Sequence, residues 1–256
     1  MPAVATQSGD PWGTPPERLT LIDRAVHLWR ASLDLTPARL QGLAETLSED
    51  ERAGASRFRF ERDRRRYVAC RAVLRTILGR YLRVAPGSLK FRYSPHGKPA
   101  IANGPGANAI RFNVSHAESM ALFGFSRGRE LGIDLERVRS DFAIDEIADR
   151  FFSQNEVAAL RALRPADRVL AFFRCWTRKE AYIKARGDGL SLPLAQFDVS
   201  LLPGEPAALL STRHDPPDAA RWSLEEPLAG PEFVAAIAVE GHGWQLQCWE
   251  WPAPGA

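Results

Sequence analysis

Two long amphipathic segments, about one hundred residues apart, constrain the fold of this chain most. From about residue 63 to residue 83, apolar side chains recur at the i, i+3, i+4, i+7 spacing of a helix. A second long helix is expected over residues 167–185, and it should end at the glycines Gly187 and Gly189. Short apolar runs follow each segment. We therefore expect two copies of one helix-and-strand unit.

The remaining patterns complete this α+β prediction. Strands are expected at residues 89–93, 110–114 and 121–125 in the first half, and at 131–136, 197–201, 233–239 and 245–249 in the second, with a further helix over 145–163. We predict two pseudo-symmetric halves, each a long helix packed on a small, mostly antiparallel sheet, with a ligand cleft between them. The expected halves are residues 19–128 and 129–251, and the expected peripheral ends are residues 1–18 and 252–256, where Pro and Gly are frequent.

Composition narrows the class of protein. The 256 residues include 45% hydrophobic and 25% charged residues, which is typical of a globular protein. Cys70, Cys175 and Cys248 lack the spacing of a metal site and are expected to be reduced thiols. The first residues carry no signal-peptide pattern, and no apolar run is long enough to cross a bilayer. We therefore expect a cytoplasmic protein with no membrane partner.

Residues 57–66 contain six arginines, although the formal net charge of the chain is only +3. Such a cluster favours an anionic partner, either a phosphate-bearing ligand, an acidic protein surface or nucleic acid. The alternative is a solvated helix face with no binding role.

Two carboxylates share one face of the predicted strand 131–136. Its apolar residues alternate with Gly132, Asp134 and Glu136, so these three point the same way. Neighbouring carboxylates repel each other, which favours either a cation between them or exposure to water. Carboxylate oxygens suit Mg²⁺. The alternative is an edge strand with one solvent-exposed face and no bound ion.

A second candidate pair lies on the predicted helix 167–185. Glu180 and Lys184 are one turn apart and follow Phe173 and Thr177 along the edge of the apolar face. A carboxylate and an ammonium in this position could face a half-buried cleft. The alternative is a surface ion pair of the i, i+4 type that contributes only a little stability.

Together these segments resemble a known family. The motif G-I-D-L-E at 132–136, followed by F-x-x-x-W-T-R-K-E-A-Y-I-K-A-x-G-x-G-L-S-L-P at 172–193, resembles the paired signature of 4'-phosphopantetheinyl transferases. The length is similar to that of the monomeric, surfactin-synthetase-activating type with two fused halves, rather than the short trimeric holo-acyl-carrier-protein synthase type. The resemblance implies transfer of the phosphopantetheine group of coenzyme A to a serine of an apo acyl or peptidyl carrier protein, with release of 3',5'-ADP.

The resemblance also implies the site residues. By analogy, Mg²⁺ bridges the pyrophosphate of coenzyme A to Asp134, Glu136 and Glu180, while Lys184 contacts the phosphates. Glu180 would take the serine proton. A carboxylate on a metal is a weak base, however, so a metal-bound hydroxide is the alternative.

Further motifs extend the resemblance to coenzyme A binding. Residues 112–116, Phe-Asn-Val-Ser115-His116, resemble a family segment whose histidine touches a phosphate, and Lys98-Pro99 resembles a loop by the adenine. Arg66 falls where the family has a basic residue near the 3'-phosphate. The chain departs from the family at Glu51 and Gly54, where relatives often carry lysines, which leaves Arg52 or Arg57 as possible substitutes.

Two rival functions use the same residues. Three carboxylates and a lysine would also serve a magnesium-dependent hydrolase of a nucleotide pyrophosphate. A non-catalytic carrier-binding or nucleic-acid-binding protein could use the arginine cluster, but it would have no need of the four signature residues. We therefore expect a monomeric transferase whose partners are coenzyme A and carrier proteins, not nucleic acid.

Overall fold

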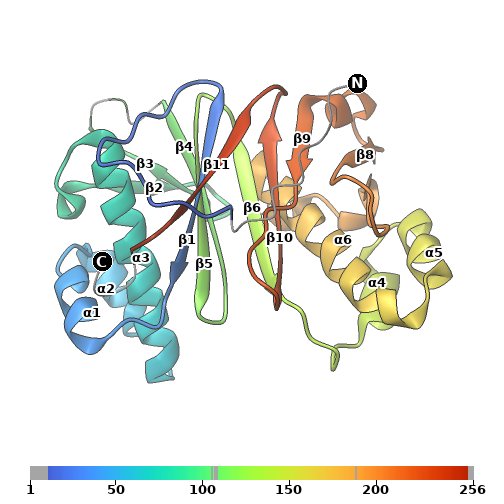
Figure 1. Ribbon diagram of the computed structural model, residues 1–256, viewed down its shortest axis with the longest axis horizontal. Coiled ribbons are helices and arrows are strands. Elements are labelled where there is room, and N and C mark those ends of the chain that lie inside the picture. The colour runs from blue at the N-terminus through green and yellow to red at the C-terminus, as the bar shows by residue number, and fades with distance from the viewer. Residues whose placement is uncertain (1–10, 105, 107–108, 188, 253–256) are drawn as a thin grey trace.

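The computed structural model describes residues 11–104, 106, 109–187 and 189–252, and it has four layers, helix, sheet, sheet and helix (Figure 1). The first sheet has the order β11 (Gln245–Glu250), β1 (Ala25–Ser32), β5 (Met120–Arg127) and β4 (Ile110–Ala117), and the second has the order β6 (Leu131–Arg137), β10 (Phe233–Glu240) and β9 (Trp222–Glu225). Helix α3 (Glu61–Leu82) covers the first sheet, and α6 (Pro165–Arg186) covers the second. The prediction of an α+β fold with two similar halves is confirmed.

Shorter elements surround these layers. They are α1 (Pro37–Ala44), α2 (Glu49–Ala55), α4 (Ile144–Phe151), α5 (Gln154–Ala162), β2 (Phe91–Tyr93), β3 (Pro99–Ile101), β7 (Phe197–Val199) and β8 (Leu209–Thr212), with 3₁₀ turns η1 (Pro86–Ser88), η2 (Gly189–Ser191), η3 (Leu194–Gln196) and η4 (Pro216–Arg221). Strands β2 and β3 form a hairpin that belongs to neither main sheet. None of the helices in the described ranges is long and apolar enough to span a membrane.

Three predicted features need correction or comment. The helix expected over 145–163 is wrong as one element, because Ser153 starts a new helix with a capping box and splits it into α4 and α5. Strand β11 crosses the expected division at residue 128, because it pairs in parallel with β1 in the first sheet. Within the expected peripheral end 1–18, Trp12 is buried and donates a hydrogen bond to the Leu228 carbonyl oxygen.

The space between the two sheets is apolar. Residues 131, 133 and 135 of β6 and residues 235, 237 and 239 of β10 pack there against β1 and β5. Strict alternation then turns the other face of β6, with Gly132, Asp134 and Glu136, towards α6. The sequence pattern predicted this orientation correctly.

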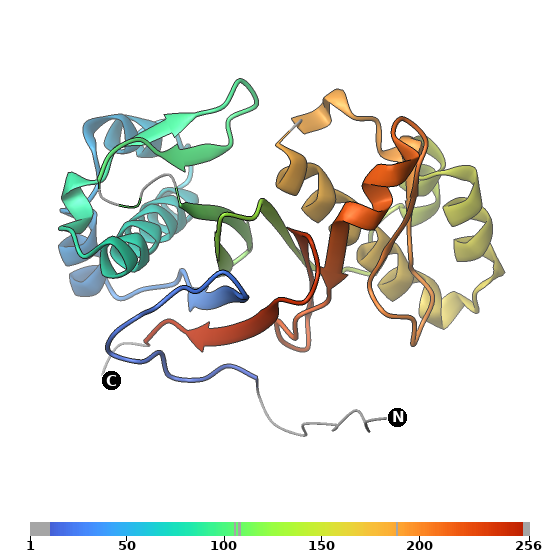
Figure 2. The same ribbon diagram turned by 90° about the horizontal axis from the view of Figure 1, so that it is seen from above.

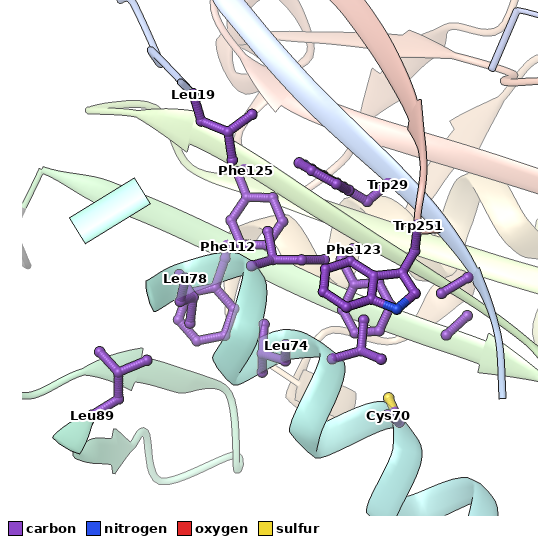
Figure 3. Close-up of a cluster of buried hydrophobic side chains, with 14 of the residues drawn as sticks. Leu19, Trp29, Cys70, Leu74, Leu78, Leu89, Phe112, Phe123, Phe125 and Trp251 are labelled. Carbon is purple, nitrogen blue, oxygen red and sulfur yellow. The ribbon is translucent and has the colours of Figure 1, made fainter. Parts of the chain in front are cut away.

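The two long helices pack on their sheets at different distances, because the side chains between helix and sheet differ in size. Large aromatic side chains, including Trp29, Phe112 and Phe123, fill the layer between α3 and the first sheet (Figure 3). Under α6 the sheet instead presents Gly132 and small alanines of β10. A Cβ atom on Gly132 would overlap with the backbone of α6 at residues 181, 184 and 185. The glycine therefore allows the helix backbone to touch the strand.

Each half also contains a buried ion pair between a capping-box glutamate and a cation of the long helix, which we call the anchor. In the first half, Glu51 closes the capping box of α2, is 1% exposed, and pairs with Arg75 of α3. In the second half, Glu156 closes the capping box of α5, is 3% exposed, and pairs with Lys179 of α6.

The cations of these two anchors also hold the chain that follows each long helix. Arg75 donates to the carbonyl oxygens of Pro86 and Leu89, and Lys179 donates to those of Leu194 and Phe197. This shared arrangement supports the pseudo-symmetry expected from the sequence.

We predict that Gly132→Ala destabilises the protein by about 3 kcal/mol, because the added methyl group must push α6 away from β6. Urea unfolding would measure the change. Gly42→Ala is the matched control: Gly42 lies in α1, and nothing lies within 4 Å of the place that an added methyl group would take, so this substitution should be neutral or stabilising. Equal stability of the two variants would contradict the close packing of α6 on β6.

Candidate functional site

A cleft lies where the two halves meet, between the β2–β3 hairpin, β4 and the C-terminal end of α6. Figure 2 shows the hairpin reaching from the first half towards the segment after α6. The cleft has a volume of about 250 Å³, and its lining includes His96, Lys98, Asn113, Glu180, Lys184 and Gly187. A second hollow of about 300 Å³ shares Lys98 and Pro99 with it and extends towards Arg92 and Arg111. Several of the predicted residues therefore line one continuous region.

Asp134 and Lys184 form the centre of the site. The Lys184 ammonium lies 2.5 Å from Asp134 Oδ1, and the Ser115 hydroxyl donates to the same oxygen at 3.2 Å. Asp134 is only 4% exposed. Its second oxygen, Oδ2, is buried and has no hydrogen-bond partner within the part of the chain that the structure describes. A buried carboxylate oxygen without a partner is costly, so this atom is suited to a cationic ligand.

Strand β4 aligns β6 through side chains rather than through a backbone ladder. The Asn113 Oδ1 atom accepts a hydrogen bond from the Ile133 amide at 2.9 Å, and Ser115 Oγ accepts one from the Leu135 amide at 3.2 Å. The two strands belong to different sheets. Asn113 was not among the predicted site residues, although two polar residues alternating within the apolar segment 110–117 could have identified it.

Glu136 and Glu180 lie within electrostatic reach of Asp134. Burial, followed by repulsion from Asp134, raises the pKa of Glu136 to about 7 and also raises the pKa of Glu180, while Lys184 opposes both shifts. As they stand, no three His, Cys, Asp or Glu side chains among the described residues are close enough together to hold a metal ion. A cation would nevertheless relieve the repulsion between these carboxylates.

Lys98 and Pro99 occupy the turn and second strand of the hairpin. The Lys98 ammonium donates to the carbonyl oxygens of Leu131 and Ala185 and to Glu130, at 3.0–3.2 Å. Burial lowers the pKa of Lys98. Its ammonium thus ties the hairpin to β6 and to the end of α6, a role that its motif does not reveal.

His116 and Arg66 are not among the residues that line the cleft or the second hollow. Desolvation, followed by the positive charges of Lys184 and Arg66, lowers the pKa of His116. Arg66 forms two hydrogen bonds to Asp34, at 2.9 and 3.1 Å, and a longer one to Glu118. An anion at Arg66 would therefore compete with these carboxylates.

Arg62, Arg64, Arg65 and Arg66 of the arginine cluster have partners within the same chain, although several of these contacts lie at the surface. Arg62 pairs with Asp63, Arg64 pairs with Glu61, and Arg65 donates to the Leu35 carbonyl oxygen. Both candidate substitutes at the 3'-phosphate are exposed, and Arg52 also donates a hydrogen bond to the Glu45 carbonyl oxygen. These intramolecular partners balance a large part of the positive charge of the arginine cluster, so the cluster does not require nucleic acid as a partner.

Other residues of the α6 signature are structural. Lys179 is completely buried in its ion pair with Glu156. Arg178 is 2% exposed and bonds Glu226 and the Ser200 carbonyl oxygen. Arg178 and Lys179 of α6 therefore point into the core, whereas Glu180 and Lys184 line the cleft, as the periodicity of a helix requires.

Comparison with known proteins covers both halves of the chain. Residues 130–238 match the family described as ACPS, the 4'-phosphopantetheinyl transferase superfamily, and residues 29–124 match the 4'-phosphopantetheinyl transferase N-terminal family. The chain is 43% identical over 240 residues to the 4'-phosphopantetheinyl transferase HetI of Nostoc sp., an alignment that covers 94% of this chain and 98% of that protein. It is 32% identical over 171 residues to the 4'-phosphopantetheinyl transferase Sfp of Bacillus subtilis, covering 66% and 74% of the two chains.

The raised pKa of Glu136 predicts a pH effect on stability. Between the ordinary value of 4.5 and about 7, the folded protein keeps a proton that the unfolded chain has lost, so stability falls as pH rises through this window. In buffer with a chelator, the free energy of unfolding of Glu136→Gln should exceed that of the wild type by about 1–2 kcal/mol at pH 8, after allowance for solvent screening. At pH 4 the two free energies should be nearly equal. Urea unfolding at both pH values tests this, with the exposed Glu146→Gln as control. A pH-independent difference would contradict it.

Proposed function

Since the chain belongs to the 4'-phosphopantetheinyl transferase family, we propose that the cleft beside Lys184 is where it performs that family's reaction. The enzyme moves the 4'-phosphopantetheine group of coenzyme A to a serine of an apo acyl or peptidyl carrier protein and releases 3',5'-ADP. Both family matches and the relatives carry transferase names, so the hydrolase and the non-catalytic binding protein have no support there. The observation that carries the assignment of the site is the buried contact of Lys184 with Asp134 at the cleft.

We propose that Asp134, Glu136 and Glu180 hold a Mg²⁺ ion. The partnerless Oδ2 atom of Asp134 and the raised pKa values of the two glutamates support this assignment, because a divalent cation would stabilise all three ionised carboxylates. Lys184 occupies the other oxygen of Asp134 and leaves Oδ2 for the ion. When bound, Mg²⁺ supplies stabilisation of negative charge on phosphate oxygens.

The remaining predicted residues fit coenzyme A along the cleft. Lys98 and Pro99 would border the adenine, and Arg66 the 3'-phosphate, while Ser115, His116 and Lys184 would meet the pyrophosphate. The electrostatic effect of both Lys184 and Arg66 on His116 supports this order, since three such groups suit an anion. A bound phosphate would also favour the protonated form of His116.

The chemistry needs a proton acceptor and neutralisation of developing charge. We propose that the carboxylate of Glu180, which lines the cleft together with Lys184, accepts the proton of the carrier serine as its oxygen attacks the phosphorus atom and 3',5'-ADP leaves. The Lys184 ammonium stabilises negative charge on the phosphate oxygens in the partly desolvated cleft. Ser115 holds Asp134, and thereby Lys184, in place.

We further propose that one chain is sufficient. The cleft is lined by residues 96–99, 113 and 114 and by residues 180, 183, 184, 187 and 189 of the same chain, which supports a monomer whose halves, residues 19–128 and 129–251, each supply part of the site. The first half would supply the adenine and 3'-phosphate contacts, and the second the metal and catalytic residues. As expected from the sequence, we place the enzyme in the cytoplasm with no nucleic-acid or membrane partner.

The direct test is mass spectrometry of the carrier. Incubation of the enzyme with coenzyme A, magnesium and an apo carrier protein should increase the mass of the carrier by one phosphopantetheine group, and a carrier whose modified serine is replaced by alanine should stay unchanged. Release of 3',5'-ADP at the same rate without any carrier would instead identify a hydrolase.

We predict that Glu180→Gln reduces turnover by about 100-fold or more while the protein stays folded, because the variant loses both the proton acceptor and a metal ligand. Single-turnover assays at saturating magnesium and coenzyme A would measure this. Glu146→Gln, an exposed change on α4, should behave as the wild type. If Glu180→Gln kept wild-type turnover, Glu180 would be neither the base nor an essential ligand.

A further inference from the structure

The hairpin β2–β3 shapes both hollows of the site but has little stability of its own. It consists of two strands of three residues and joins no larger sheet. Isolated two-stranded hairpins are marginally stable in water. Residues 92–94 and 98–100 nevertheless line the hollow that extends towards Arg111, and residues 96–99 line the cleft beside Lys184. Contacts outside the hairpin must therefore hold it in position.

The tip of the hairpin is held by the second half of the protein. Lys98 donates to the Leu131 and Ala185 carbonyl oxygens. His96 packs against Gly189, where a Cβ atom would lie 2.9 Å from the His96 Cβ. These contacts fix one end only, so the base of the hairpin needs its own support.

The base is held by a buried ion cluster centred on Glu51. The two carboxylate oxygens of Glu51 accept hydrogen bonds from Arg71 Nε at 2.7 Å and from Arg75 Nε at 2.5 Å. The side chains of Glu51 and Arg75 are each 1% exposed. Glu51 itself lines neither hollow.

The two arginines that Glu51 binds also contact the first strand of the hairpin. Both guanidinium groups lie over the Phe91 ring, 5.0 Å from its centre. Arg71 also donates to the Tyr93 hydroxyl at 3.0 Å, and Arg75 donates to the Leu89 carbonyl oxygen at 2.9 Å. The carboxylate of Glu51 thus fixes the two cations on which strand β2 rests.

We propose that Glu51 is a positioning residue for coenzyme A: through Arg71 and Arg75 it sets the place of the β2–β3 hairpin, and thereby the affinity for the nucleotide part of the substrate. This inference rests on the proposed function of the cleft. Without the carboxylate, Arg75 stays buried without its counter-charge, and Arg71 is free to turn towards solvent and release Tyr93. Glu51 touches neither the carrier nor the reacting atoms, so its loss affects nucleotide binding rather than the chemical step.

The second half provides a matched control. Glu156 has the same capping-box position, the same burial and a partner cation on the long helix. The segment that its partner Lys179 holds, residues 194–197, lines neither hollow. Glu156→Gln therefore matches Glu51→Gln in chemistry and differs in what the anchor positions.

Steady-state kinetics and calorimetry of the two variants test the proposal. Glu51→Gln should raise the KM for coenzyme A, and its dissociation constant by calorimetry, about ten-fold, the factor expected when a charge-assisted hydrogen bond is lost. The kcat and the KM for the carrier should stay within about two-fold of the wild type. Hydrogen exchange should accelerate over residues 91–101. Glu156→Gln should leave the affinity for coenzyme A unchanged.

Two results would overturn the proposal: equal losses of coenzyme A affinity in both variants, or an unchanged affinity in Glu51→Gln. If Glu51→Gln does not fold, Tyr93→Phe decides the question, because it removes only the hydroxyl group that Arg71 binds. It should raise the KM for coenzyme A about three-fold, and an unchanged KM would refute the link. A wild-type enzyme that binds coenzyme A but modifies no carrier would defeat the proposed function instead.

Discussion

The contact between the backbone of α6 and strand β6 at Gly132 is the constraint on which the rest of the structure depends. Because no side chain separates the two elements there, Lys184 reaches Asp134, and Glu180 comes within electrostatic reach of the same carboxylate. Asn113 and Ser115 of β4 accept hydrogen bonds from the backbone of β6 and so fix the strand that carries Asp134 and Glu136. A helix held farther away, as α3 is by its aromatic layer, could not bring an ammonium to a carboxylate buried on the strand.

The two halves have the same arrangement of helix, sheet and buried ion pair, but they carry different residues at the positions that face the site. Both use a capping-box glutamate that is paired with a cation on the long helix, and both cations hold the chain that follows that helix. At the positions along α3 that correspond to Glu180 and Lys184 of α6 stand Thr76 and Arg80. The first half therefore lacks the helix carboxylate that a divalent ion would need, and it offers cations and a hairpin instead. This division suits a substrate with a phosphate-rich nucleotide at one end and a reacting pyrophosphate at the other.

The sequence predicted the parts of the fold that depend on local periodicity. The orientation of Asp134 and Glu136 followed from alternation in β6, and the C-terminal end of α6 followed from Gly187. Strand β1 was missed because it is buried on both faces and shows no alternation, and the return of β11 to the first sheet depends on a partner more than two hundred residues away. The ties of Lys98 to backbone carbonyl groups and of Arg66 to Asp34 also involve distant partners, so motifs alone could not reveal them. The roles of the site residues remain predictions.

The central claim is that one divalent ion is shared by Asp134, Glu136 and Glu180 beside the pyrophosphate of coenzyme A. Anomalous diffraction from crystals grown with Mn²⁺ and coenzyme A tests it most directly, because manganese replaces magnesium at oxygen sites and gives a signal of its own. The account predicts a single strong peak within bonding distance of carboxylate oxygens from all three residues and of a pyrophosphate oxygen. A peak elsewhere, or one that Glu180 does not reach, would contradict the account.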